Sequence, residues 1–214
     1  ELLALDSASG AERWRTPFAG GWLSVRGATL YAEPREGLER VDAYDAATGA
    51  LRWSHAGSLA AADARSAYLL IGDEEALALD SVTGAERWSR DWADPRHDAM
   101  MPGALSTPGM LAAYRFGLND GNFEMRLNSV DPLTGAERWR ATLLPTPAGD
   151  SMSFDLLSLD NRALLVQIQA EWFWLDAATG ELRLVAYGRE ARVSDGTVYL
   201  LGFGEISALG WREP

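Results

Sequence analysis

A short phrase with fixed internal spacing recurs five times along this chain. In each copy an Asp is followed by Ser or Thr at the third residue, Gly at the fourth, Arg at the seventh, and Trp or Leu at the eighth. The copies begin at Asp6, Asp45, Asp80, Asp131 and Asp176, with gaps of 39, 35, 51 and 45 residues between them. A fixed unit within a drifting period indicates a repeat architecture, so this phrase constrains the fold before any other feature does.

Each phrase predicts a β-hairpin. The apolar run before the Asp, such as Ala76–Leu79, has the length of a strand and is too short for a helix. Asp and Ser/Thr side chains accept backbone N–H groups in turns, and the Gly provides the positive φ of a bulged hairpin loop. The same residues recur in every copy, whereas an active site is needed once, so we interpret them as structural. They are Asp6, Gly10, Asp45, Gly49, Asp80, Gly84, Asp131, Gly135, Asp176 and Gly180.

The residue at the eighth position lies on the returning strand of the hairpin. A repeating unit cannot bury its apolar faces alone, so a Trp at one register in each unit predicts docking onto the neighbouring unit. The rings are Trp14, Trp53, Trp88 and Trp139, and Leu184 takes this place in the fifth copy. If the docking place persists there, we expect Leu184→Trp to be neutral or stabilising.

Two further positions repeat. The Arg before the ring is interpreted as a charge on an outer strand that discourages edge-to-edge aggregation. The second residue before the Asp is small in four copies, which predicts that another layer packs closely there, and Trp174 replaces it in the fifth. The Arg residues are Arg13, Arg52, Arg87, Arg138 and Arg183, and the small residues are Ala4, Ala43, Ala78 and Ser129.

Between successive phrases, each repeat adds two more strand candidates linked by Gly, Asp and Asn turns. Four strands in a unit of about 40–45 residues is the pattern of a β-propeller blade. We predict an all-β fold, a β-propeller of four-stranded antiparallel blades in one domain over residues 1–214, with five blades in this chain or part of a six- to eight-bladed ring. The segments are a blade remnant at 1–18, blades at 19–56, 57–92, 93–144 and 145–188, and a last partial blade at 189–214. In a closed ring, Ala11–Arg15 would supply the missing outer strand of the last blade.

With these residues, the chain resembles the PQQ-like (pyrroloquinoline-quinone-like) β-propeller repeat family, whose blades carry Ala-Leu-Asp, two variable residues, Thr-Gly and then Trp. The best copies run from Ala4 to Trp14 and from Ala78 to Trp88. The family includes quinoprotein dehydrogenases, an outer-membrane assembly scaffold lipoprotein and sensor domains of bacterial membrane kinases. The resemblance implies a periplasmic or extracellular location and leaves a cytoplasmic one open. The family's enzymes bind PQQ with Ca²⁺ or a lanthanide, and many place an adjacent Cys pair against the cofactor, whereas this chain has no Cys.

Composition limits the classes of partner and ligand that we expect this chain to bind. The formal net charge is −12, and duplex binding rests on clustered Lys and Arg, so we expect no nucleic-acid partner. No apolar run approaches the roughly 20 residues that span a bilayer, so the chain is not expected to be membrane-embedded. The two His residues, His55 and His97, are too few for a His-rich metal site. We expect no metal and no cofactor, with PQQ and Ca²⁺ as the alternative.

The candidate binding surface is the face that carries the loops between blades and between second and third strands. The longest connector, from Trp92 to Pro108, has a length typical of functional or mobile loops; a lid that plugs the central channel is the structural alternative. The turns between second and third strands are acidic, which suits Ca²⁺, a basic partner, or simple solvation. The candidate binding residues are Trp92, Arg96, His97, Met100, Met101, Glu33, Asp73, Glu74 and Asp120.

Every repeated residue thus has a structural explanation, and no catalytic set remains. We expect a non-catalytic binding module that holds a protein or peptide through its loop face, as a scaffold or as the extracytoplasmic sensor domain of a larger bacterial protein. The alternative is a PQQ-binding quinoprotein, active or degenerate. A structural spacer with no ligand of its own is the third hypothesis.

Overall fold

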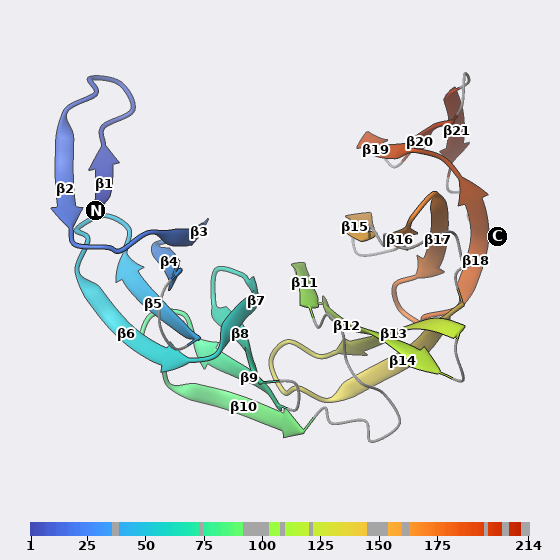
Figure 1. Cartoon of the computed structure of the whole chain (residues 1–214), viewed down its shortest axis with the longest axis horizontal. Coiled ribbons are helices and arrows are strands. Elements are labelled where there is room, and N and C mark those ends of the chain that lie inside the picture. The colour runs from blue at the N-terminus through green and yellow to red at the C-terminus, as the bar shows by residue number, and fades with distance from the viewer. Residues whose placement is uncertain are drawn as a thin grey trace. The chain divides into compact units, whose positions relative to one another are not determined.

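The computed structural model describes residues 1–35, 39–72, 75–91, 103–107, 110–119, 122–144, 154–159, 163–194, 197–202 and 206–210. Every regular element within these ranges is a β-strand (Figure 1), so the all-β prediction is confirmed. Within the same ranges, no helix has the length and apolar character needed to cross a bilayer.

The strands form six sheets, and in each sheet the strands lie side by side in chain order. Every pairing whose register is described is antiparallel. The sheets are β1 (Leu2–Leu5) with β2 (Glu12–Thr16); β3 (Gly21–Arg26), β4 (Thr29–Pro34), β5 (Arg40–Asp45) and β6 (Leu51–Ala56); β7 (Ser58–Ala62), β8 (Ser66–Ile71), β9 (Glu75–Asp80) and β10 (Glu86–Asp91); β11 (Gly103–Thr107), β12 (Met110–Asn119), β13 (Asn122–Val130) and β14 (Glu137–Leu143); β15 (Phe154–Leu159), β16 (Ala163–Ile168), β17 (Glu171–Asp176) and β18 (Leu182–Tyr187); and β19 (Glu190–Ser194), β20 (Thr197–Leu201) and β21 (Ile206–Gly210). The strands of each sheet lie within the corresponding predicted blade segment.

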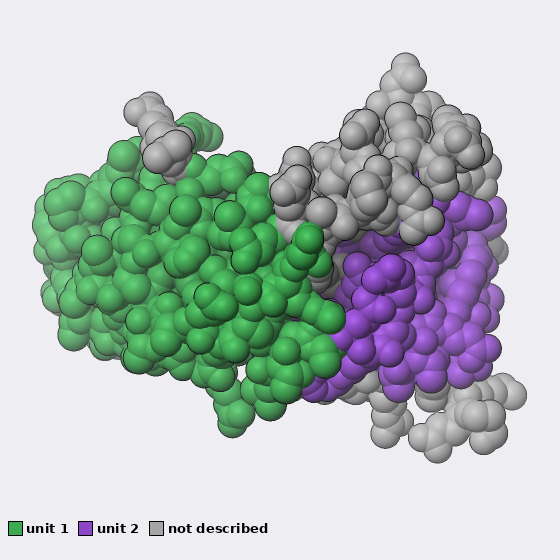
Figure 2. All heavy atoms as spheres, turned by 90° about the horizontal axis from the view of Figure 1, so that it is seen from below, with its two compact units in different colours: residues 1–95, 102–106, 132–136 green, residues 96–101, 107–131, 137–214 purple. Residues whose placement is uncertain are grey.

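The chain divides into two compact units (Figure 2). Unit 1 comprises Glu1–Pro95, Pro102–Ser106 and Pro132–Ala136, and unit 2 comprises Arg96–Met101, Thr107–Asp131 and Glu137–Pro214. Unit 1 contains β1 to β10, and unit 2 contains β12 to β21. That the two units make one domain stays a prediction.

The core of unit 1 lies on both faces of the sheet β3–β6, because successive side chains of a strand point to opposite faces. One face shares a buried cluster with the sheet β7–β10, formed by Tyr31, Val41, Ala43, Ala67, Leu69, Leu77 and Leu79. On the other face, Leu30, Ala32 and Tyr44 form a cluster with Leu2, against which Trp14 packs. Apolar residues at both parities of the strands are therefore explained by burial on both faces.

In unit 2, the faces of the sheets β15–β18 and β19–β21 share a third cluster. Its largest members are Trp172 and Trp174 of β17, which pack with Val198 and Leu200 of β20. These rings lie on the third strand of their sheet, whereas the repeated Trp of the phrase lies on the fourth.

The sheets β1–β2 and β19–β21 have fewer strands than the others. β2 pairs with β1, and among the described strands none pairs with the outer edge of β21. The pairing of Ala11–Arg15 with the last sheet is therefore not seen among the described strands. The number of blades in the ring stays a prediction.

Candidate functional site

The Asp of each phrase holds the turn that follows it. Asp80 Oδ1 accepts hydrogen bonds from Val82 N at 3.0 Å, Thr83 N at 2.9 Å and Thr83 Oγ1 at 3.0 Å. The same three bonds recur at Asp6 and Asp45. The Gly of the five copies has φ between 68° and 72°, the left-handed conformation that favours Gly. The carboxylates of these phrases therefore stabilise their turns through hydrogen bonds.

The Arg at the seventh position is the extra residue of a β-bulge. Tyr44 pairs with Leu51 and Ala43 pairs with Trp53, so Arg52 has no residue opposite it. A bulge re-aims the side chain of the extra residue, and here it brings a guanidinium nitrogen of Arg52 to 2.6 Å from Oδ2 of the phrase Asp. The corresponding distances in the other four copies are 2.5, 2.6, 2.6 and 3.4 Å. This Arg binds the carboxylate of its own turn, a contact that the interpretation as an outer-strand charge did not include, and its effect on aggregation stays a prediction.

These bonds lower the pKa of the carboxyl groups of Asp6, Asp45, Asp80 and Asp176. The guanidinium of Arg13, with the hydroxyl and N–H of Ser9, lowers the pKa of Asp6 to about 2. At Asp80 the N–H of Thr83 is the largest cause, Arg87 adds to it, and the pKa is also about 2. A carboxylate with so low a pKa is a poor general base near neutral pH.

Each Trp of a returning strand contacts the turn of the next phrase. Trp53 Nε1 donates a hydrogen bond to Ser81 O at 3.3 Å, and a Cβ built on Gly84 would come within 2.6 Å of the Trp53 ring. The ring therefore requires Gly in the turn, in addition to the requirement for positive φ. The equivalent sets are Trp14 with Ala46 and Gly49, Trp88 with Pro132 and Gly135, and Trp139 with Ala177 and Gly180.

The small residue two positions before the Asp lies between two aromatic rings of its own sheet. In the sheet β3–β6, Ala43 pairs with Tyr31 on one side and Trp53 on the other, and the ring centroids are 6.0 Å apart. The sheet β7–β10 repeats this row with rings 6.1 Å apart, formed by Tyr68, Ala78 and Trp88. A larger central side chain would separate the rings. Packing between the two rings therefore adds a reason for the small residue, and Ala43 also lies in the cluster shared with the next sheet, as the predicted approach of another layer requires.

Among the candidate binding residues, Glu33 alone lies within the described part of the chain. Its Oε1 accepts a hydrogen bond from Leu59 N of the next sheet at 2.8 Å. Burial raises the pKa of Glu33, and the bond from Leu59 opposes this shift. Glu33 therefore connects two sheets of unit 1. The candidates outside the described residues are Asp73, Glu74, Trp92, Arg96, His97, Met100, Met101 and Asp120.

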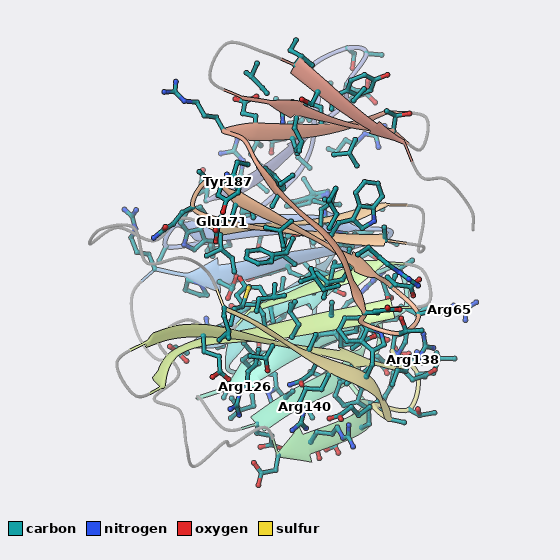
Figure 3. The ribbon with its side chains drawn as sticks, turned by 90° about the vertical axis from the view of Figure 1, so that its right-hand side faces the viewer. Arg65, Arg126, Arg138, Arg140, Glu171 and Tyr187 are labelled. Carbon is teal, nitrogen blue, oxygen red and sulfur yellow. The ribbon has the colours of Figure 1, made fainter. Side chains whose placement is uncertain are left out.

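A second acidic residue, Glu171, is the first residue of β17 and lies in unit 2 beside an exposed ring (Figure 3). Its Oε1 accepts a hydrogen bond from the Tyr187 hydroxyl at 3.1 Å. Glu171 is buried, whereas Tyr187 is 68% exposed. The preceding turn contains Gln169 at φ 58°, a conformation uncommon outside Gly. The N–H of Gly188 bonds Ala170 O at 2.9 Å and ties this turn to the connector after β18.

Large apolar side chains are exposed in groups on β3, on β18 and on β20 with β21, in addition to Leu3, Leu5, Leu51, Val82, Leu133 and Leu144 elsewhere in the described residues. Trp22 of β3 is 79% exposed, although buried aromatic rings dominate protein cores. β18 differs from the other fourth strands, since it reads Leu-Arg-Leu-Val-Ala-Tyr where β10 reads Glu-Arg-Trp-Ser-Arg-Asp. Grouped apolar exposure marks interaction surfaces. The side chains of these groups are Trp22, Leu23 and Val25 on β3, Leu182, Leu184, Val185 and Tyr187 on β18, and Tyr199, Leu201 and Ile206 on β20 and β21.

The acidic and His side chains of the described residues do not cluster into a metal site. Within them, no three His, Asp or Glu side chains lie together in a way that could hold one. His55 lies on β6, and its Nδ1 is 2.7 Å from Ala56 O. The expectation of no cofactor, with PQQ and Ca²⁺ as the alternative, stays a prediction, and no chemical step is assigned to that cofactor.

Comparison with solved structures identifies the fold. A quinohemoprotein alcohol dehydrogenase, ADHIIG, from Pseudomonas putida HK5 has a TM-score of 0.61 at 17% identity, over 92% of this chain and 43% of that chain. A europium-containing methanol dehydrogenase has a TM-score of 0.58 at 14% identity, over 88% of this chain and 48% of that chain. The chain has the PQQ-like β-propeller fold. BamB from Moraxella catarrhalis has a TM-score of 0.46 at 16% identity, over 96% of this chain and 77% of that chain.

This PQQ-like propeller chain spans less than half the length of the two dehydrogenases it resembles. At these identities the likeness shows the fold alone. No protein-family model matches the sequence, and no curated protein matches it. The resemblance that the repeated phrase carries is thus confirmed for the fold.

Proposed function

We propose that this PQQ-like propeller chain is a non-catalytic binding module that holds a protein or peptide, as a scaffold or as the extracytoplasmic sensor domain of a larger bacterial protein. The observation that carries the proposal is the grouped exposure of apolar side chains, on β3 in unit 1 and, separately, on β18, β20 and β21 in unit 2. Aromatic residues are enriched at protein interfaces, where they supply large contact area at low entropic cost. Trp22 and Tyr187 are side chains of this kind.

The chemistry of the repeated residues supports the same function. The phrase carboxylates accept backbone N–H groups and pair with Arg, so their charge is used to hold turns. The repeated Trp rings contact the next turn. The recurring residues therefore serve to stabilise the fold. The exposed apolar side chains of the described strands remain as candidate contacts for a partner. A periplasmic or extracellular location belongs to this proposal.

Turnover and cofactor titration test the proposal against the quinoprotein alternative. The purified chain is titrated with PQQ and Ca²⁺ while its melting temperature and absorbance are followed. A ligand at 100 times its Kd stabilises a protein by about 2.7 kcal/mol, so binding would raise the melting temperature. We expect no shift and no oxidation of alcohols with an artificial electron acceptor. Turnover with PQQ and Ca²⁺ would overturn the non-catalytic assignment.

Site-specific photo-crosslinking tests the binding surface itself. A photoreactive amino acid replaces Trp22 in one variant and Glu86, an exposed residue of β10, in the matched control. We expect the producing cells to yield a discrete cross-linked complex from the first position and none from the second. Equal cross-linking from both positions would contradict the assignment of the exposed apolar strands as the binding surface.

A further inference from the structure

The junction between the two four-stranded sheets of unit 1 contains a carboxylate that bonds across it. Glu33 of β4 accepts a hydrogen bond at its Oε1 from the N–H of Leu59 in β7, the first strand of the next sheet, at 2.8 Å. The connector between the two sheets is also held, because the N–H of Gly57 donates to Glu39 O at 2.9 Å. This connector and the end of β4 lie on the face that carries the loops between blades. Glu33 therefore joins two segments of that face.

Unit 2 contains a junction of the same design with a neutral side chain. Gln167 of β16 has the register of Glu33, since each lies four residues after the residue that pairs with the phrase Asp. The Gln167 amide donates to Arg189 O, in the connector before β19, at 3.4 Å. In this connector too, a Gly N–H bonds a backbone carbonyl at 2.9 Å. A side chain at this register thus contacts the following connector in one unit and the following strand in the other.

A third sheet shows that the register does not require a charged side chain. In the sheet β7–β10 the position is occupied by Leu70, which is 5% exposed. An amide and an apolar side chain therefore serve where Glu33 stands in the sheet β3–β6. Burial of a charge has a desolvation cost that neither of these side chains incurs. The carboxyl group adds to the junction the one property that the other two lack, which is titration.

The surroundings of Glu33 disfavour its ionised form. Burial raises the pKa of Glu33 above its ordinary value of 4.5, and the charge of Glu39 raises it further. The hydrogen bond from Leu59 acts in the opposite direction and does not cancel the shift. The link between the two sheets is therefore made by a group whose charge the folded chain resists.

The other charged side chains of the neighbouring described strands do not neutralise Glu33. On β3, Trp22 lies opposite Glu33, and Arg26 lies at the far end of the strand, opposite Thr29. The described strands β7 and β8 contain no charged residue. The remaining charged or titratable groups are Arg40 and Asp42 of β5, which pair with each other, Asp45 of β5, which pairs with Arg52, the exposed Arg35 after β4, and His55 on β6, two strands away.

We propose that Glu33 is an acid-responsive link between the sheets β3–β6 and β7–β10, which is strengthened when its carboxyl group takes up a proton. A protonated carboxyl group gains an O–H donor and keeps acceptor capacity. The bond from Leu59 N is thus retained while the buried charge is removed. The proposal goes beyond the proposed binding function and holds whether or not the chain binds a partner.

The direction of the response follows from the raised pKa. The folded chain takes up this proton at a higher pH than the unfolded chain does. The stabilisation by protonated Glu33 is therefore complete below the ordinary pKa of 4.5 and is lost as the pH rises through the folded value. The phrase carboxyl groups of Asp6 and Asp80, whose pKa values are lowered, respond in the opposite direction.

Urea denaturation of the intact 214-residue chain at pH 4, 5, 6 and 7 tests the proposal. Glu33→Gln introduces the side chain that Gln167 has at the same register, and every other carboxyl group is shared with the wild type. We expect the unfolding midpoint of the wild type, relative to that of Glu33→Gln, to fall as the pH rises. A difference that stays constant, or that changes in favour of the wild type, overturns the proposal.

Glu86→Gln is the matched control, because it removes the same charge from an exposed position on β10. We expect the difference between this variant and the wild type to stay constant over the same pH range. An equal pH dependence for Glu86→Gln and Glu33→Gln would assign the effect to net charge and overturn the link.

Nuclear magnetic resonance of the wild type observes the link directly and remains decisive if Glu33→Gln does not fold. The amide resonance of Leu59 is followed over the same pH values. We expect it to move with a midpoint above 4.5, the ordinary value for Glu, and to lose this movement in Glu33→Gln. A midpoint below 4.5 overturns the proposal. Cofactor titration and cross-linking test the binding function separately, so a failure at Glu33 leaves that function standing.

Discussion

Trp174 lies directly opposite Leu184 in the β17–β18 hairpin, with the large and small residues exchanged relative to the other four hairpins. Elsewhere the small residue is on the third strand and the Trp is on the fourth, as in the pair of Ala78 with Trp88. Trp174 packs in the cluster shared with β20. The two departures that the sequence shows, Leu184 in the Trp place and Trp174 in the small place, are therefore one exchange across a single pair of residues.

This exchange reverses the expectation for Leu184→Trp. A second ring at position 184 would meet Trp174 across the pair, and overpacking typically costs about 1–3 kcal/mol. We expect a loss near the low end, about 1 kcal/mol, because the exposed side of Leu184 gives the ring some room. In a Trp174→Ala background the same substitution should raise stability, since it restores the arrangement of the other hairpins. Urea denaturation of the wild type, the two single variants and the double variant measures the coupling, and an effect of equal sign in both backgrounds would contradict it.

The contact of Trp88 with the next turn predicts a large cost for removing this ring. Its indole is 8% exposed and donates a hydrogen bond to Pro132 O at 3.1 Å. Replacing a buried Trp by Ala typically costs about 3–5 kcal/mol, so we expect Trp88→Ala to lower the free energy of unfolding by that amount. The matched control is Trp22→Ala on the exposed strand β3, where a change within about 0.5 kcal/mol is expected. An unchanged melting temperature for Trp88→Ala would show that the ring does not hold the fold.

Glycine substitutions separate backbone strain from the ring contact. Gly10 and Gly84 have φ of 69° and 71°, but a Cβ on Gly10 meets nothing within 4 Å, whereas one on Gly84 meets the Trp53 ring at 2.6 Å. Left-handed backbone costs a non-glycine residue roughly 1–2 kcal/mol, and we expect about that loss for Gly10→Ala. Gly84→Ala should cost more, by about 1–3 kcal/mol, because it also overpacks the ring. Thermal unfolding of the two variants compares them, and equal losses would remove the steric role of Trp53.

The hairpin and its turn chemistry could be predicted from the sequence because they depend on residues close in the chain. Asp80, Thr83 and Gly84 lie within five residues, and the bonds between them follow from side-chain chemistry alone. Contact of Trp53 with the following phrase could also be expected, because a repeating register implies a repeating neighbour. The structure adds the acceptor, Ser81 O, and the reason why Gly84 admits the ring.

Other features required the register of the strands. In the bulge, Leu51 and Trp53 each have a residue opposite them on β5, whereas Arg52 has none. The sequence does not show which residue of a strand lies in the bulge. The row of Tyr31, Ala43 and Trp53 joins three strands, so the reason for the small residue emerges only when all three are aligned. Tyr199 and Ala208 repeat the Tyr and Ala of this row. A comparison of all second and third strands in the sequence could reveal this pair.

Contacts between sheets and the exposure of strands were the least predictable features. Glu33 was chosen for its acidic turn, yet its carboxylate bonds a backbone N–H of the next sheet. Local sequence does not mark Trp22 as exposed, because an aromatic residue in a strand is ordinarily expected in the core. Solvent exposure depends on which sheets cover a strand, and local sequence does not encode that cover.

Acid titration provides the last prediction. The pKa values of Asp6 and Asp80 are about 2 in the folded chain, against an ordinary value of 3.8. Because the folded pKa is lowered, the unfolded chain binds more protons, so the stabilisation is complete above about pH 4 and is lost as the pH falls toward 2. Asp80→Asn should therefore destabilise the chain at pH 6, and the difference from the wild type should shrink as the pH falls from 4 to 2. Arg87→Gln should give a smaller difference, because the N–H of Thr83, the largest cause of the shift, remains. Denaturation curves at pH 6, 4, 3 and 2 measure these differences, and a difference for Asp80→Asn that stays constant over this range would show that the turn gains nothing from the ionised carboxylate.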